Sequence, residues 1–584
     1  MRLNIFHRPD PGPLYDVYRE EQKLVHELGF RSTIFLYYRD LLNPQAVQDA
    51  LGDAEQFGDE IGLALHNMEG EGLEELARGL NAVWLLPQKE KREVITRAIA
   101  KFEQVIGKRP TSIASYHFDA ASLRIIEEIA PEVEGVVGGC FEEGVRVFHG
   151  CNHSWYLFNE GMPWGPWYPS RIHSLKPARD EKDGLGIVAV PHLSRDMSLA
   201  YEGRNDFWAS HPPNVIRGMG NDASFCPYDR NLIDQYRMQE DFNGESYYNI
   251  FVGPQWLTHN HNSEYPPEVA WSLYRTQLEY LAELKEQGEV VDQTLTEYAT
   301  WHKQHHALEK GAPRDIYLAK EMLYGSGKHY FWYIDADQRI LVDATQGGSI
   351  GDIRAYVGDV AVDTGPDTDA MAIGTYPYLV QSQHRTGYPN HFQDGSRTTL
   401  KLRLGGEEVD LATSRTRVAK VEKKDGETVI ELTPARFVFS RGVHGEIVTT
   451  YRFLPGGRTE ITRRVASLSD ASAQLELVEY LKGCYGKTEY PEKLHGVKLT
   501  LEGASAAAMD FEYRGRDETR QRATAVAADV PMAGTRVALS PKQGDAASGT
   551  IREGHLFSPY YTLSLAYQAN EKTSVTTCLT LTSI

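Results

Sequence analysis

The stretch Glu21–Leu36, EQKLVHELGFRSTIFL, joins a helical segment to a run of β-forming residues. The helical segment spans about Asp16–Leu28, the β-rich run covers Ser32–Tyr37, and a short apolar run at Leu3–Phe6 precedes both. Alternation of short apolar runs with amphipathic helices indicates βα units, which build a mostly parallel sheet or barrel.

The same alternation continues to about residue 310. The pattern predicts helices over 89–106 and Pro267–Gln287, and in the second the apolar residues recur at helical spacing, as expected for a closing helix. Further strands are predicted at Ile61–Leu65, Ser112–Tyr116, Gly135–Val137, Gly186–Val190 and Asn249–Val252. We therefore predict an α/β barrel over residues 1–310.

After the barrel region, the chain changes to alternating strands broken by Gly-Gly, Asp-Gly and Pro-Gly turns, which is typical of a large antiparallel β-sandwich. The expected strands include Thr398–Leu404, Thr428–Leu432, Glu446–Phe453, Thr459–Val465 and Gln474–Tyr480. A chain of 584 residues also exceeds what one hydrophobic core supports. We predict a catalytic barrel domain at 1–310 and a β-sandwich domain at 311–584, joined by a short connection near Leu308–Lys320.

The composition and net charge of the chain exclude some classes of binding partner. The apolar share of 41% and the charged share of 24% are those of ordinary globular proteins. A formal net charge of −20 opposes attraction to phosphate backbones and anionic membranes, so we expect no nucleic-acid or membrane partner. Five dispersed cysteines without CxxC spacing indicate neither a disulfide framework nor a thiolate zinc site. Because no signal-like segment opens the sequence, we expect a cytoplasmic protein.

Histidine and carboxylate residues follow most of the predicted barrel strands. In parallel α/β barrels the functional side chains emerge at the carboxyl ends of the strands, so we expect these residues to share one mouth. Imidazole and carboxylate groups there suit general acid and base catalysis, or a divalent cation such as zinc. The catalytic candidates are Asp10, His117, Asp119, Glu142, Glu143, His192 and His259, and the candidate ligands of a zinc-like metal are His66, Asp10 and His117.

An aromatic segment with several Pro and Gly residues lies between the predicted strands at 135–137 and 186–190. It cannot form a long helix or a regular strand. Tryptophan and tyrosine faces suit the apolar faces of sugar rings, while packing against the second domain is the alternative. The substrate-binding candidates are Trp155, Trp164, Trp167, Tyr168, Trp256 and His261.

Segments of the first half resemble the polysaccharide deacetylase (NodB-homology) superfamily and the related glycoside hydrolase families 57 and 38. Glu21–Leu36 is similar to a helix and strand of that superfamily, Asp59–Asn67 (DEIGLALHN) to its HEIG strand, and Gly107–Tyr116 (GKRPTSIASY) to its G-x-R-P segment. Residues 249–298 resemble its closing strand, helix and tail. Gly445–Ala466 resembles the sandwich of families 38 and 57 and of mutarotase-like domains. The resemblance implies a distorted (β/α)7-type barrel followed by a large antiparallel β-sandwich.

The resemblance also implies functional positions. His66 matches the first histidine of the deacetylase HxxxH motif, but position 70 is Gly70, and a single Asp10 stands where the deacetylases have an aspartate pair. In family 57 the nucleophile is a carboxylate on the fourth strand, for which Glu142 or Glu143 is the match by position.

From these features we predict a carbohydrate-active hydrolase, specifically a glycoside hydrolase that acts on an oligo- or polysaccharide at the barrel mouth. The alternatives are a metal-dependent carbohydrate deacetylase and a glycan-binding protein without catalysis. A lyase acting on uronic acids is a further alternative. The sequence predicts no particular oligomeric state.

Overall fold

The structure is a computed structural model, and it divides into two compact units. The first unit comprises Met1–Pro313 and Ala361–Tyr376, and the second comprises Arg314–Val360 and Pro377–Ile584. The residues it describes are 1–9, 12–66, 68–79, 83–115, 117–139, 161–202, 227–258, 267–308, 314–322, 325–360, 362, 376–382, 396–484, 496–503, 506–510, 517–544, 546–553 and 560–584.

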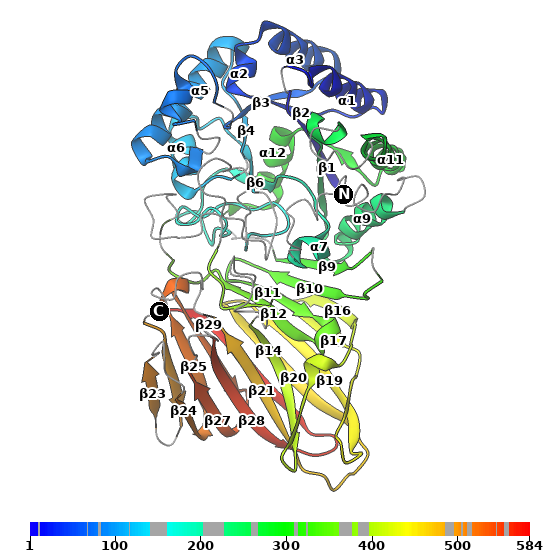
Figure 1. The fold of residues 1–584 in the computed structure, drawn as a ribbon, viewed down its shortest axis with the longest axis vertical. Coiled ribbons are helices and arrows are strands. Elements are labelled where there is room, and N and C mark those ends of the chain that lie inside the picture. Colours follow the sequence, from blue (N-terminus) through cyan, green and yellow to red (C-terminus); the bar gives the residue numbers. More distant parts are fainter. Residues whose placement is uncertain are drawn as a thin grey trace. The chain divides into compact units, whose positions relative to one another are not determined.

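The first unit is built on a parallel sheet that curls into a nearly closed barrel (Figure 1). Its strands pair in the order β6-β5-β4-β3-β2-β1-β7, and β8 also pairs with β1. Every pairing in this sheet is parallel. The strands are β1 (Arg2–His7), β2 (Thr33–Leu36), β3 (Glu60–Ala64), β4 (Ser112–Ala114), β5 (Gly135–Gly139), β6 (Val188–Pro191), β7 (Tyr247–Phe251) and β8 (Val291–Asp292). The predicted barrel strands are confirmed.

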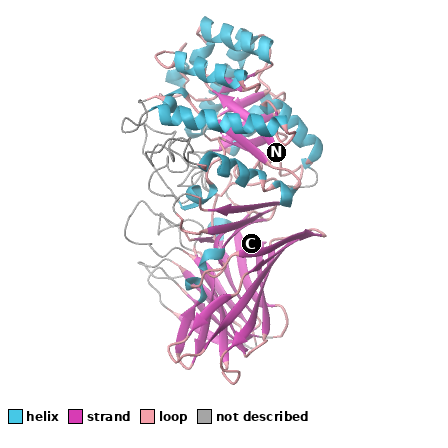
Figure 2. Ribbon diagram, turned by 90° about the vertical axis from the view of Figure 1, so that its right-hand side faces the viewer, coloured by secondary structure: helices cyan, strands magenta, loops and turns pink. Residues whose placement is uncertain are grey.

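Helices cover the outside of this sheet, as Figure 2 shows for the helical half of the chain. They follow the strands in the chain, as βα units require. Their bounds are α1 (Tyr15–Glu27), α2 (Tyr38–Leu41), α3 (Pro44–Phe57), α4 (Leu73–Leu76), α5 (Gln88–Ile106), α6 (Ala120–Ile129), α7 (Met197–Glu202), α9 (Tyr228–Arg237), α10 (Glu240–Asn243), α11 (Pro267–Glu286) and α12 (Leu295–His305). No helix among the described residues is both long and apolar enough to cross a membrane.

Side-chain hydrogen bonds bridge the gap between the outer strands β6 and β7. Asn249 on β7 donates from Nδ2 to the carbonyl of Pro191 at the end of β6, at 2.6 Å. Ser194, just after β6, accepts from the backbone N–H of Asn249 at 2.9 Å and donates to its side-chain oxygen at 3.0 Å. These bonds bring the carboxyl end of β6 beside β7 and therefore close to β1.

The interior of the barrel is apolar and closely packed. Phe6, Phe35, Ala64, Ala114 and Val137, one from each of β1 to β5, belong to one buried cluster. On β3, a Cβ atom at Gly62 would lie 2.7 Å from the Phe35 ring and 2.6 Å from the Ser112 hydroxyl, so any larger residue there would have to displace these side chains.

The second unit is an antiparallel β-sandwich, as predicted. One sheet has eleven strands in the order β24-β27-β28-β21-β14-β12-β11-β10-β9, with β13 and β15 paired beside it; the other has ten in the order β16-β17-β19-β20-β29-β26-β25-β22-β23, with β18 paired to β19. The strands of the first sheet are β9 (Asp315–Lys320), β10 (His329–Ile334), β11 (Gln338–Asp343), β12 (Ser349–Ala355), β13 (Val380–Gln381), β14 (Arg397–Leu404), β15 (Glu407–Asp410), β21 (Leu475–Gly483), β24 (Glu518–Ala523), β27 (Ala546–Arg552) and β28 (Tyr561–Ala569). Those of the second are β16 (Val418–Lys424), β17 (Glu427–Leu432), β18 (Ala435–Val438), β19 (His444–Leu454), β20 (Arg458–Leu468), β22 (Lys498–Glu502), β23 (Ala507–Asp510), β25 (Ala525–Val530), β26 (Thr535–Pro541) and β29 (Ser574–Ser583).

The connection predicted near Leu308–Lys320 is wrong in its second part. Residues Asp315–Lys320 form β9, the edge strand of the eleven-stranded sheet, and pair along their whole length with β10. A six-residue edge strand owes its structure to this pairing, which the local sequence does not reveal.

Candidate active site at the carboxyl edge of the barrel sheet

Three basic side chains from different strand ends meet in the barrel. Arg8 follows β1, His66 lies two residues beyond β3, and His192 follows β6. The guanidinium of Arg8 donates from Nη1 to Nε2 of His66 at 2.5 Å and from Nη2 to Nε2 of His192 at 2.9 Å. All three residues are buried. We call Arg8, His66 and His192 the Arg8 cluster.

The charge of the Arg8 cluster is held on the arginine. An imidazole nitrogen that accepts from a guanidinium carries no proton, so both Nε2 atoms present lone pairs to Arg8. Burial, together with the charges of Arg8 and Arg39, lowers the pKa of His66 well below its usual value, which keeps that ring neutral. The guanidinium carbon lies 3.8 Å from the centre of the Phe251 ring, in cation–π geometry. The result is a fixed positive charge at the edge of the sheet where catalysis is expected.

Buried side chains around His7 support the end of β1. His7 contacts Gln22 through Nδ1, and its Nε2 lies 3.0 Å from the Tyr274 hydroxyl and 3.4 Å from a carboxyl oxygen of Glu21. Burial lowers the pKa of His7 to about 4 and raises the pKa of Glu21 well above its usual value. Burial therefore favours the uncharged form of both groups. They position the backbone next to Arg8.

The carboxylate of Asp119 makes structural contacts with two helices. It is the N-cap of α6, where it accepts from the backbone N–H of Ser122 at 3.0 Å, and it pairs with Lys91 on α5. Both side chains of this pair are fully buried. The other candidate after β4, His117, is buried with its ring edge-on to Trp84, at 5.7 Å between centroids. Their catalytic roles stay predictions.

The four described aromatic candidates are buried. Trp164 and Trp167 are each 2% exposed, and Tyr168 and Trp256 are nearly as covered. The indole of Trp167 donates to the carbonyl of Ser174 at 3.0 Å, and the Tyr168 hydroxyl donates to the carbonyl of His306 at 2.8 Å. Stacking on sugar rings stays a prediction for these residues, and it requires that their ring faces become uncovered.

The remaining candidates lie outside the described residues, and their roles stay predictions. They are Asp10, Glu142, Glu143, Trp155, His259 and His261.

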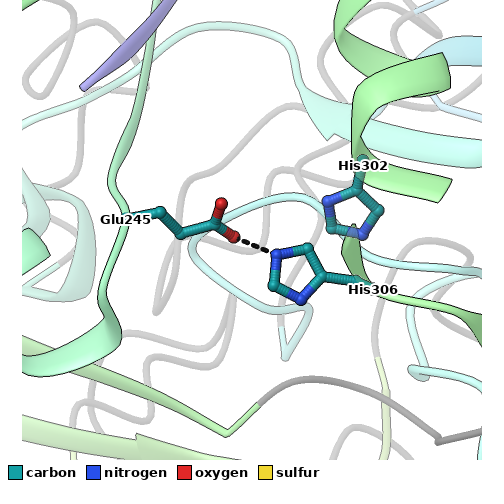
Figure 3. A group of neighbouring side chains, drawn as sticks. All are labelled: Glu245, His302 and His306. Atoms are coloured by element: carbon teal, nitrogen blue, oxygen red, sulfur yellow. Dashed lines mark ion pairs between the residues drawn. The ribbon is translucent and has the colours of Figure 1, made fainter. Parts of the chain in front are cut away.

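Sequence reasoning missed two features of the first unit. It did not assign a role to Arg8, which directly follows the predicted first strand. It also missed a group at the other end of the barrel formed by Glu245, His302 and His306 (Figure 3). The spacing of His302 and His306, four residues apart at the end of a helix, is a signal that could have identified part of this group.

No protein-family model matches the chain, and no curated protein matches it. Among solved structures, a candidate glycoside hydrolase/deacetylase from Parabacteroides distasonis is 15% identical, with 67% of this chain and 90% of that chain covered and a TM-score of 0.43. A 4-alpha-glucanotransferase from Thermococcus litoralis is 8% identical over 99% of both chains, with a TM-score of 0.29. A galactose mutarotase-like protein from Clostridium acetobutylicum is 8% identical over 46% of this chain and 98% of its own, also with a TM-score of 0.29.

Proposed function

We propose that the chain is a carbohydrate-active hydrolase, and specifically a glycoside hydrolase that acts on an oligo- or polysaccharide at the carboxyl edge of the barrel sheet. The observation that supports this proposal is the Arg8 cluster. It joins residues from the ends of β1, β3 and β6 at the place where parallel barrels carry their catalytic groups.

The charge of Arg8 has a use in glycoside hydrolysis. Two carboxyl groups carry out this reaction, and one of them must be ionised to act as nucleophile or base. A guanidinium nearby lowers the pKa of a carboxyl group and so favours the ionised form. We propose Asp10, two residues after Arg8, and Glu142 or Glu143, which follow β5 in the chain, for this pair. His66 and His192 would then position the guanidinium.

The alternative, a metal-dependent deacetylase, needs a metal at His66. At the Nε2 atom of His66 the place of an ion is taken by Arg8, whose Nη1 lies 2.5 Å from that nitrogen. The carboxylate of Asp119 is paired with Lys91 instead, and Gly70 offers no ligand. We therefore favour hydrolysis by carboxylates at this edge.

Product analysis tests the proposal. The purified chain is incubated with a panel of plain and acetylated oligosaccharides, and new reducing ends and free acetate are measured with and without a chelator. We expect new reducing ends that persist under chelation, and a loss of at least about 10³-fold in Glu142→Gln or Glu143→Gln, with the exposed Glu181→Gln as control. Acetate release that stops on chelation would support the deacetylase instead, and binding without turnover would support a glycan-binding protein.

A further inference from the structure

A cavity opens at the amino-terminal end of the barrel strands. Its volume is about 1100 Å³, and its wall includes Arg2 at the start of β1, Ser246 just before β7 and Val291 at the start of β8. Parallel strands begin at one edge of their sheet and end at the other, so this cavity lies at the opposite edge from the Arg8 cluster. Glu245 and His306 also line it.

Two residues that line this cavity form a group of potential metal ligands with the buried His302. Glu245, His302 and His306, which we call the Glu245 triad, each offer one ligand atom, and these atoms all lie within 4.8 Å of one another. Figure 3 shows the carboxylate of Glu245 directed at the His306 ring, with the His302 ring beside it. The distance from Glu245 Oε1 to His306 Nε2 is 2.5 Å. His302 is buried, whereas the other two side chains are partly exposed.

The backbone fixes the two imidazoles next to each other. The helix α12 begins at a capping box formed by Thr294 and Glu297. His306 is the C-cap residue directly after the helix, and its backbone N–H donates to the carbonyl of His302 at 2.7 Å. Residues four apart on a helix lie on one face, and here the ring centroids are 4.8 Å apart. Glu245 comes from the segment that leads into β7, whose register is set by its pairing with β1. The fold itself therefore brings the three residues together.

An independent observation also indicates a ligand. The Nε2 atom of His302 is buried and has no hydrogen-bond partner among the described residues, and Nδ1 meets only the Tyr298 hydroxyl, at 3.3 Å. Buried polar atoms nearly always have a partner, and a bound ion would supply one.

We propose that the Glu245 triad binds a divalent transition-metal ion of the zinc class, with one coordination position open to the cavity. Two imidazole nitrogens and one carboxylate oxygen form a common zinc ligand set that leaves a fourth position free. Magnesium and calcium prefer sites made of oxygen atoms only. Tetrahedral zinc with these ligands needs ligand atoms about 3.3 Å apart, so small rotations of the partly exposed Glu245 and His306 side chains suffice. This site is independent of the proposed hydrolase function.

Zinc binding to the whole chain tests the proposal. Zinc content is measured by mass spectrometry after loading and desalting. The affinity for zinc is measured by competition with a chromophoric chelator, and the coordination geometry is measured by the visible absorption of the cobalt form. We expect one tightly held zinc ion per chain. His302→Ala and Glu245→Gln should each weaken binding by at least about 10-fold. His305→Ala, one position from His306 on the same helix end, and Glu240→Gln, in the wall of the same cavity, are the matched controls and should bind as wild type.

Two further measurements distinguish zinc binding at this site from zinc binding at the barrel mouth, and a loss of the site from misfolding of a variant. His66→Ala should retain the zinc ion, and zinc should raise the melting temperature of the wild type but not of the Glu245→Gln variant. If His302→Ala fails to fold, Glu245→Gln and His302→Gln provide the comparison. A wild-type chain that holds no zinc, or zinc that is lost in His66→Ala and kept in the triad variants, would overturn the proposal. Hydrolase activity that persists under chelation does not contradict the zinc proposal, because the zinc site and the barrel mouth are separate.

Discussion

Arg8 is the residue whose position is hardest to explain by folding alone. It places a full charge between two imidazoles in the barrel, within hydrogen-bond distance of His66 and His192. Lysine carries the same charge on a single nitrogen, so it cannot donate to the two imidazoles from two separate nitrogens in the fixed geometry of a guanidinium. We predict that Arg8→Lys lowers kcat/KM on the substrate identified above by about 10²-fold or more. The control is Arg39→Lys, and wild-type activity in Arg8→Lys would show that the cluster has no part in turnover.

Glu21 makes the stability of the barrel depend on pH. Its pKa is raised in the folded state by burial, so above the ordinary value of 4.5 the folded chain keeps a proton that the unfolded chain has lost. Stability should therefore fall as pH rises above about 4.5, by up to about 1.4 kcal/mol per pH unit. Glu21→Gln removes this dependence, so the variant should gain stability relative to wild type from pH 5 to 7. Urea unfolding at several pH values measures the difference.

The contribution of His7 cancels in this comparison. Its pKa is lowered to about 4 by burial, so it costs stability as pH falls below 6.5, but it does so in both proteins. The exposed Glu20→Gln is the matched control and should leave the pH dependence unchanged. A constant difference between Glu21→Gln and wild type across the pH range would show that Glu21 ionises in the folded chain.

Residues at strand ends were the predictable part of the site. His66 and His192 were found because polar residues after parallel strands converge on one edge. The bridging role of Arg8 was not predicted, because it depends on β6 lying close to β1. That closure involves hydrogen bonds from the backbone and side chain of Asn249 to Pro191 and Ser194. No periodicity in the sequence reveals such a bond. The Glu245 triad joins residues 57 to 61 positions apart, from 245 to 302 and to 306, which only the folded barrel brings together.

At the scale of elements, the two sheets of the sandwich are joined by a buried ion pair. Arg463 on β20 donates to both carboxyl oxygens of Glu479 on β21, at 3.0 and 2.9 Å, and to the Thr449 hydroxyl at 2.9 Å. Both charged side chains are at most 2% exposed. An aromatic contact also joins the two sheets, since Phe453 on β19 stacks on Tyr333 of β10. Such a pair specifies how the two sheets meet.

Breaking this pair should be costly, whereas replacing it should not. We predict that Arg463→Met lowers the free energy of unfolding of the sandwich by about 3 kcal/mol or more, because it leaves a buried carboxylate without its partner. The double variant Arg463→Met/Glu479→Leu should recover most of that loss. Guanidinium unfolding followed by circular dichroism measures both. Equal losses in the single and double variants would mean that packing, and not the unpaired charge, sets the cost.

Strands buried by their own apolar runs were predictable, and strands that depend on a neighbour were not. The run Ser32–Tyr37 contains β2, and Thr398–Leu404 forms nearly all of β14. The edge strand β9 was missed because its structure comes from pairing with β10.

At the scale of the whole molecule, the first unit is not continuous in sequence. Residues 361–376 count with the barrel, although the residues on both sides of them belong to the sandwich unit. The sequence predicted contiguous domains at 1–310 and 311–584, since composition changes only once along the chain. Tyr376, at the end of this segment, is buried, and its ring lies edge-on to His173 at 5.1 Å.

This interruption predicts that the barrel is weakened when it is cut from the rest of the chain. A chain ending at Pro313 lacks Tyr376, and losing a buried aromatic side chain costs about 3 kcal/mol. We expect the barrel transition of the shortened chain, followed by calorimetry, to fall by about 5 °C or more relative to the full chain. Tyr376→Ala in the full chain should lower the same transition, while Tyr376→Phe, which keeps the ring, should not. An unchanged transition in both the shortened chain and Tyr376→Ala would show that the segment adds nothing to the barrel, and residues 1–313 would then be a complete folding unit.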